Sequence, residues 1–181
     1  MMLLRAVTLV LIGLICADGG VSAQQRIGGR INEYTPVRSI SIRDCHADVV
    51  VENASAFSRG NVVLIIQMKG ATAGGTYDVS AVGRFEFGTV DTVIGSTLRL
   101  THPLIHTYDV RGRVQCVRVP VYPNVIASFP ITGDPWNGST GGVIALDVRG
   151  TLRLEAPIDA SGLGFRGGTT WVSGATCSTM T

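Results

Sequence analysis

The stretch GGVIALDVRGTLRLEAPIDASGLGFRGG, Gly141–Gly168, decides the fold that the sequence predicts. It contains three short strand-like pieces separated by glycine or proline: Val143–Val148, Thr151–Leu154 and Ile158–Ala160. Each piece is too short to bury an apolar face alone, so the pieces are expected to stack as turns, here called rungs, of a parallel β-helix. The side chains expected to point inward in such a stack are Leu146, Val148, Leu152, Leu154 and Ile158.

This β-helix-like, Gly-rich region is expected to occupy residues 141–181 and to be incomplete. Roughly three or more rungs are needed for a stable solenoid, and the sequence supplies one or two. We therefore expect the chain to be the N-terminal part of a longer protein, or a truncated copy of one.

Upstream, from Ile31 to Val121, the chain reads as short strands separated by turn residues. Val62–Met68 is apolar nearly throughout, which predicts a strand covered on both faces, whereas alternation at Phe85 and Phe87 predicts a strand with one buried face. Residues 24–122 are therefore predicted to form a small β-barrel or sandwich. The expected strands are Ile40–Ile42, Val49–Glu52, Asn61–Met68, Tyr77–Phe87, Thr97–Leu100 and Gly112–Val119.

Residues 123–140 are predicted to be a Pro-rich linker or loop between these two regions. Prolines interrupt the strand pattern just before this segment and within it, and Trp136-Asn137-Gly138 is typical of an exposed turn. The interrupting prolines are Pro120, Pro123, Pro130 and Pro135.

Composition supports an all-β protein. The 181 residues include 22 Val, 14 Ile and 17 Thr but one Lys and four Glu, which favours pleated sheet over surface helices and excludes a helical bundle. The net charge of +2 and the dispersed arginines give no basic face, so nucleic acid is not an expected partner.

The N-terminus predicts export. Residues 1–23 contain a positive start at Arg5, an apolar run over Ala6–Ala17 and small residues at Val21-Ser22-Ala23, as in a cleaved secretory signal. The apolar run is shorter than the ~20 residues that span a bilayer, so no membrane span is expected after cleavage. The predicted location is extracellular or on the cell surface, or periplasmic where no sorting domain follows.

Five segments, taken in order, resemble the N-terminal region of large secreted surface proteins of Bacteroidota-type bacteria, which are often named for gliding-motility-associated or type IX secretion C-terminal domains. The resemblance implies secretion and surface display rather than a particular chemistry. Because the sequence continues only to Thr181, attachment through a C-terminal sorting domain is not an expectation for this chain. The segments are INEYTPV (Ile31–Val37), ENASAFSRGNVVLIIQMKGA (Glu52–Ala71), VQCVRVPVY (Val114–Tyr122), PWNGSTGGVIALDVRGTLRL (Pro135–Leu154) and IDASGLGFRGG (Ile158–Gly168).

No motif in the sequence predicts a catalytic, cofactor or metal site. His102 and His106 would need a helix to meet, but Pro103 and the surrounding residues favour strand or loop. Asp44-Cys45-His46-Ala47-Asp48 reads as a polar turn, and Gly162–Gly167 matches GxGxxG without a following helix. The carboxylates considered for glycan cleavage, Asp147, Glu155 and Asp159, are expected to be solvated.

Aromatic residues and cysteines supply the remaining candidates. Trp136, Tyr122 and Trp171 are candidate glycan contacts if they are exposed, although turn-anchoring aromatics are commoner. After signal cleavage three cysteines remain, so at most one intramolecular bridge can form, and the sequence leaves all three pairings open. Cys45 and Cys116 are taken as the candidate pair.

These features predict an exported structural or adhesin-like surface module without catalytic activity of its own and without a cofactor. Its expected partners are cell-surface glycans or other surface proteins. Two alternatives are kept: an ancillary N-terminal part of a polysaccharide-acting β-helix enzyme, and a carbohydrate-binding module.

Overall fold

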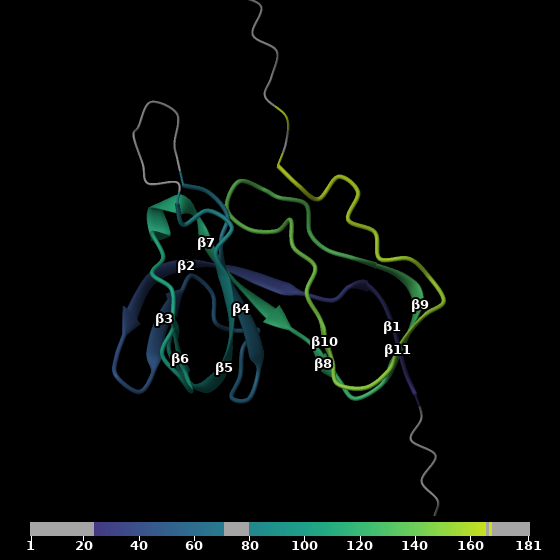
Figure 1. Ribbon diagram of the computed structural model, residues 1–181, viewed down its shortest axis with the longest axis horizontal. Helices are drawn as coiled ribbons and strands as arrows, with labels where there is room; N and C mark the ends of the chain where they lie inside the picture. Colours follow the sequence, from purple (N-terminus) through teal and green to yellow (C-terminus); the bar gives the residue numbers. More distant parts are fainter. Residues whose placement is uncertain (1–23, 71–79, 166, 168–181) are drawn as a thin grey trace, which may run out of the picture.

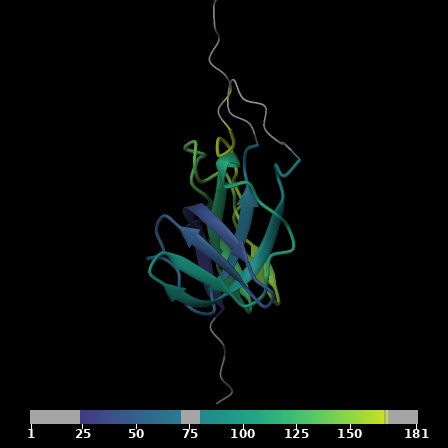
Figure 2. The same cartoon turned by 90° about the vertical axis from the view of Figure 1, so that its left-hand side faces the viewer.

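The computed structural model describes residues 24–70, 80–165 and 167, and its regular structure is almost entirely β-strand. Six antiparallel strands close into a barrel in the order β2-β3-β6-β5-β4-β7, seen at the left of Figure 1 and facing the viewer in Figure 2. The prediction of an all-β chain with a small barrel is therefore confirmed. The barrel strands are β2 (Glu33–Ile42), β3 (Ala47–Val51), β4 (Val62–Gln67), β5 (Phe85–Ile94), β6 (Thr97–Leu100) and β7 (Val114–Val119), with a short 3-10 turn at Val110–Gly112.

Strand β4 of the barrel wall is packed on both of its faces. Val63 and Ile65 are fully buried in the barrel core, while Leu64, on the opposite face, is buried against residues outside the barrel. The prediction that Val62–Met68 forms a strand covered on both faces is confirmed, because one face lines the barrel core and the other meets the second half of the molecule (Figure 1).

Strand β5 begins later than predicted and has one buried face. The predicted strand Tyr77–Phe87 overlaps residues outside the described part, and β5 begins only at Phe85. Phe85 and Phe87 lie on its outer face, 55% and 57% exposed, with their rings 6.3 Å apart. The inner face carries Gly88 and Val90, and a Cβ on Gly88 would lie 2.9 Å from Leu100 Cδ1. The interior has no room for a side chain at Gly88, so the one buried face predicted for this strand is the face of Gly88 and Val90, and the alternating phenylalanines lie on the other.

A second group of strands is parallel and stacked. Strands β1 (Gln25–Arg30), β9 (Val125–Thr132) and β11 (Leu152–Leu154) form a sheet in the order β1-β9-β11, and β8 (Val121–Tyr122) pairs with β10 (Asp147–Val148). Val125 pairs with Leu152, 27 residues later, and Val121 pairs with Asp147, 26 residues later. Offsets that agree to within one residue are the repeat of a parallel β-helix, and the prediction of its first rungs is confirmed.

The barrel is inserted into this stack. β1 precedes the barrel in the sequence but pairs in parallel with β9, which follows it, with Gln25 opposite Val125. The first rung therefore opens before the barrel and the next begins at β8, after it (Figure 1).

This arrangement differs from the predicted domain boundaries. Residues 25–30, placed with the barrel by the sequence, belong to the parallel sheet, and the predicted linker 123–140 contains β9, the central strand of that sheet. Pro130 is tolerated because it is exposed at an irregularity of the pairing, which moves from Ile27–Ala127 to Gly29–Ile131. Gly28 fits there because a Cβ would lie 2.4 Å from Cβ of Phe129. The predicted signal peptide 1–23 lies outside the described residues.

Candidate functional site

Two buried amide side chains, Gln115 and Asn32, lie where the barrel meets the stacked rungs. The segment 141–145, here called the joint segment, is bound at every second residue by a side chain of the barrel half. Gln115 Nε2 donates to the Gly141 carbonyl (3.0 Å) and Gln115 Oε1 accepts from Gly141 N (2.9 Å). Asn32 binds Ala145 in the same two ways, at 2.6 and 2.9 Å. Between them the Tyr34 hydroxyl donates to the Val143 carbonyl at 2.6 Å.

The side chains of Gln115, Tyr34 and Asn32 thus bond to alternate residues of the joint segment, as the backbone of a neighbouring strand would. Gln115 and Asn32 are almost fully buried, so their amides meet the backbone groups of the joint segment without competition from water. Burial also raises the pKa of Tyr34, because loss of hydration disfavours the phenolate.

Apolar packing covers the same joint. Leu64, Val117 and Val119 on the outer wall of the barrel are buried against Val143 and Ala145 of the joint segment. The joint therefore combines apolar packing with buried polar groups that all have hydrogen-bond partners. Such a combination fixes the orientation of one part of a fold relative to another.

The two outer edges of the parallel sheet differ in character. β1 presents Arg26, Gly29 and Arg30, which are exposed and discourage further strand pairing. At the opposite edge Leu154 and Ile158 are 53% and 43% exposed. Leu146, Val148 and Leu152 are half-buried. The predicted inward stacking of these five side chains is thus not completed within residues 24–70, 80–165 and 167, where β11 is the outermost strand.

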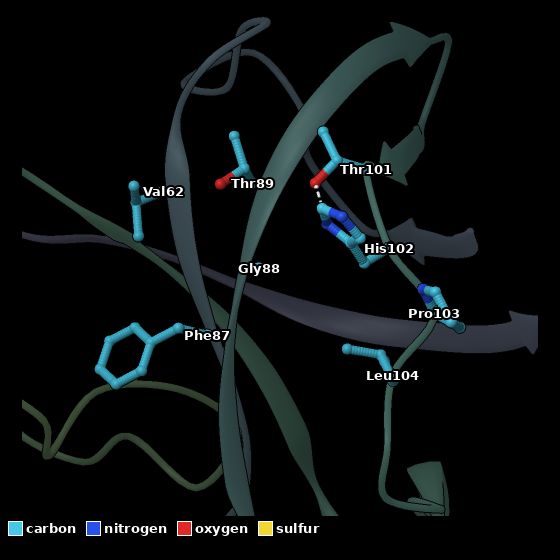
Figure 3. A pocket seen from close by; sticks show the side chains of 8 residues that line it. All are labelled: Val62, Phe87, Gly88, Thr89, Thr101, His102, Pro103 and Leu104. Carbon is cyan, nitrogen blue, oxygen red and sulfur yellow. Dashed lines mark hydrogen bonds between the residues drawn. The ribbon is translucent and has the colours of Figure 1, made fainter. Parts of the chain in front are cut away.

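A cavity of about 200 Å³ lies beside β5, where residues 101–104 leave the ladder with that strand (Figure 3). Thr101 Oγ1 lies 2.9 Å from His102 Nδ1, and Thr89 and Phe87 contribute from β5. Of the described residues that line this cavity, none is a carboxylate or a cysteine. Its hydroxyls and single imidazole therefore do not form a nucleophile–base pair with an orienting acid.

A different cavity lies at the corner formed by Lys69, Trp136, Asn137, Gly138 and Phe165, here called the aromatic corner. Its volume is about 360 Å³. The rings of Trp136 and Phe165 meet edge to face, with centroids 5.1 Å apart and planes at 61°. Trp136 N donates to the Leu163 carbonyl at 2.8 Å, which holds the two aromatic segments together.

The predicted glycan contacts fare differently. Trp136 is 6% exposed, so it supports the corner rather than offering an open stacking face. Tyr122 is half-buried in β8, where burial raises its pKa. Trp171 lies outside the described residues. Sequence reasoning missed Phe165, which is 55% exposed, and Lys69, whose signal was that it is the chain's single lysine.

The candidate disulfide is not formed in the structure. Cys116 points into the barrel core and is fully buried, which raises the pKa of its thiol, whereas Cys45 is exposed in the turn between β2 and β3. The strand register explains this, because Cys116 is paired inside the ladder with Thr35 and Ile65.

The carboxylates considered for glycan cleavage all have an ion-pair or hydrogen-bond partner. Asp147 pairs with Arg149, Glu155 with Arg26 and Arg153, and the Asp159 carboxylate accepts from Ser161 N. Within the described residues no group of three or more His, Cys, Asp or Glu side chains is arranged to hold a metal ion. The GxGxxG match includes residues outside the described part, and Gly162, with φ of 70°, lies in a turn.

Asp48, from the predicted polar turn, instead joins two barrel strands. Its carboxylate accepts from Arg99 Nε at 2.9 Å and from an Arg99 terminal nitrogen at 3.2 Å, and His46 Nε2 lies 3.6 Å away. The hydrogen bonds from Arg99 hold the pKa of Asp48 below its usual range.

We expect this pair to contribute to stability only when Asp48 is ionised. Because the folded pKa is depressed, the contribution is present above the unfolded value of about 3.9 and is lost as the pH falls through the lower folded value. Denaturant titrations from pH 7 to pH 2 are expected to show a smaller acid-dependent loss for Asp48→Asn than for the native protein. Identical pH profiles would contradict this assignment.

Comparison with known proteins finds distant structural similarity only. No family model and no curated protein matches the chain. Two solved tailspikes share part of its structure. The Gp54 tailspike of Acinetobacter baumannii bacteriophage AP22, solved with a capsular saccharide, is 13% identical, with a TM-score of 0.39 over 71% of this chain and 23% of that one. The gp49 tailspike of Pseudomonas phage LKA1 is 18% identical, with a TM-score of 0.32 over 61% and 18%.

The siderophore-interacting protein SipS from Aeromonas hydrophila is similar at a TM-score of 0.29 and 11% identity, over 69% of this chain and 71% of that one. The chain thus spans less than a quarter of either tailspike. No helix in the described part of the chain is long and apolar enough to cross a bilayer.

Proposed function

We propose that this chain is an exported, non-catalytic surface module that starts a parallel β-helix and holds it to a closed barrel. The observation that carries this proposal is the parallel pairing of β1 with β9 across the inserted barrel. The barrel is placed within the first turn of the stack and is fixed to the next rungs by the joint segment.

The contrast between the two sheet edges indicates that further rungs would add at the β11 side and not at β1. Arginine and glycine protect the β1 edge, whereas exposed leucine and isoleucine at the β11 side are suited to receive another rung. Secretion and an origin among Bacteroidota-type surface proteins remain part of the proposal, supported by the N-terminal signal pattern and the sequence resemblance.

Native-state hydrogen exchange tests whether the barrel and the rungs are one structural module. Val125 N, which donates to the Thr151 carbonyl, and barrel amides of β4 are expected to exchange through the same global opening and with the same free energy. Exchange of Val125 at a rate close to that of an unfolded peptide would contradict the proposal. Immunolabelling of intact source cells tests display, and labelling seen only after lysis would contradict export.

Catalysis is tested separately. We expect no new reducing ends or unsaturated products when the purified protein is incubated with a panel of neutral and acidic polysaccharides. Sustained turnover that survives repurification would overturn the non-catalytic assignment.

A further inference from the structure

The aromatic corner contains a cation that is held in place by its backbone. Lys69 N donates to the Gly112 carbonyl at 2.6 Å, and its own carbonyl accepts from Gln67 Nε2 at 3.1 Å. Gln67 is fully buried, and its Oε1 accepts from Asp109 N at 2.9 Å. Lys69 lines the cavity, and no carboxylate among the described residues forms an ion pair with its ammonium.

Beside this cation stands a supported aromatic ring. Phe165 is 55% exposed, and the nearly buried Trp136 packs against it edge to face. A ring that is held from behind and open in front can stack on the C–H face of a pyranose with little loss of side-chain entropy.

The rim of the cavity is also ordered. Asn137 Oδ1 accepts from Ser139 N and Thr140 N, both at 2.9 Å, and this turn places Gly138 at the cavity with φ of 100°. A residue with a side chain would be strained at that φ, so glycine is the residue suited to this turn.

We propose that the aromatic corner binds an acidic sugar unit of a polysaccharide, with the carboxylate on Lys69 and the ring on Phe165. The cavity of about 360 Å³ lies at the small end of the usual range for ligand pockets, ~300–1,000 Å³, which suits one or two sugar rings. One ammonium and one open aromatic face match a carboxylate-bearing pyranose better than a phosphate, which is usually met by several donors or by an arginine fork. This site goes beyond the proposed structural role and does not depend on it.

The test uses the purified protein with short oligomers of galacturonate, alginate and hyaluronan, each compared with its carboxyl-esterified form by isothermal titration. At least one acidic oligomer is expected to bind more tightly than its ester, with an affinity that falls as salt is raised. Lys69→Met is expected to weaken binding of the acid about tenfold or more, to the level of the ester, whereas Lys69→Arg keeps most of it.

Two further variants separate the parts of the site. Phe165→Ala is expected to weaken both the acidic and the esterified oligomer, because it removes the stacking face. Arg43→Met, which removes one positive charge from the turn between β2 and β3, is the matched control and is expected to change nothing. Amide NMR spectra check that each variant is folded.

The proposal would be overturned if none of the acidic oligomers bound, if acid and ester bound equally, or if the Lys69→Met and Arg43→Met proteins behaved alike. The binding assay measures only the aromatic corner. Hydrogen-exchange or labelling results that contradict the structural role therefore do not change the result expected for oligosaccharide binding.

Discussion

Replacement of Gln115 by leucine is expected to lower the free energy of unfolding by about 2–4 kcal/mol, since each buried polar group left without a partner costs about 1–3 kcal/mol. Leucine keeps most of the side-chain volume but leaves both the N–H and the carbonyl of Gly141 without their amide partner. Equilibrium unfolding in urea, followed by far-UV circular dichroism, measures the loss.

The matched control is Gln25→Leu, at an exposed glutamine in β1, for which a change within about 0.5 kcal/mol is expected. If Gln115→Leu were as stable as this control, buried amide hydrogen bonds would not be what holds the joint segment to the barrel.

Truncation of Leu98 to alanine is expected to destabilise the protein by about 2–5 kcal/mol, the usual range for a leucine removed from a packed core. Leu98 is 0% exposed in β6 and packs within the barrel cluster. The midpoint of urea unfolding is expected to fall with little change in the denaturant slope.

Ile94→Ala provides the comparison on β5, because Ile94 is 58% exposed. Its expected loss is below about 1 kcal/mol, since little apolar area is buried there. Equal losses for the two variants would mean that the barrel interior is not the packed core described above.

Much of the barrel was predictable because its signals are local. Thr97–Leu100 matches β6 residue for residue, and Asn61–Met68 contains β4, since runs of β-branched residues bounded by turns indicate strands directly. The short pieces after Gly141 likewise indicated rungs, although only Asp147–Val148 and Leu152–Leu154 are strands among them.

The rest depends on contacts far apart in the sequence. Nothing within Gln25–Arg30 indicates a partner a hundred residues later, and alternation at Phe85 and Phe87 does not say which face of β5 has room for rings. The joint is harder still to predict, because Gln115 and Asn32 resemble surface amides until the barrel closes around them. At the aromatic corner, Lys69 and Phe165 meet only through the folded chain.

The barrel interrupts a parallel stack whose first strand is β1. Arg26 and Arg153 both lie opposite Ile126, on either side of β9, so their Cα atoms are expected to be about 10 Å apart, two interstrand spacings. Spin labels at Arg26→Cys and Arg153→Cys, in residues 24–181 with Cys45 and Cys177 replaced by serine, report this distance by electron paramagnetic resonance. Strong dipolar broadening is expected in the folded protein and is expected to disappear in denaturant. A folded spectrum equal to the sum of the two singly labelled proteins would contradict the pairing of β1 with β9.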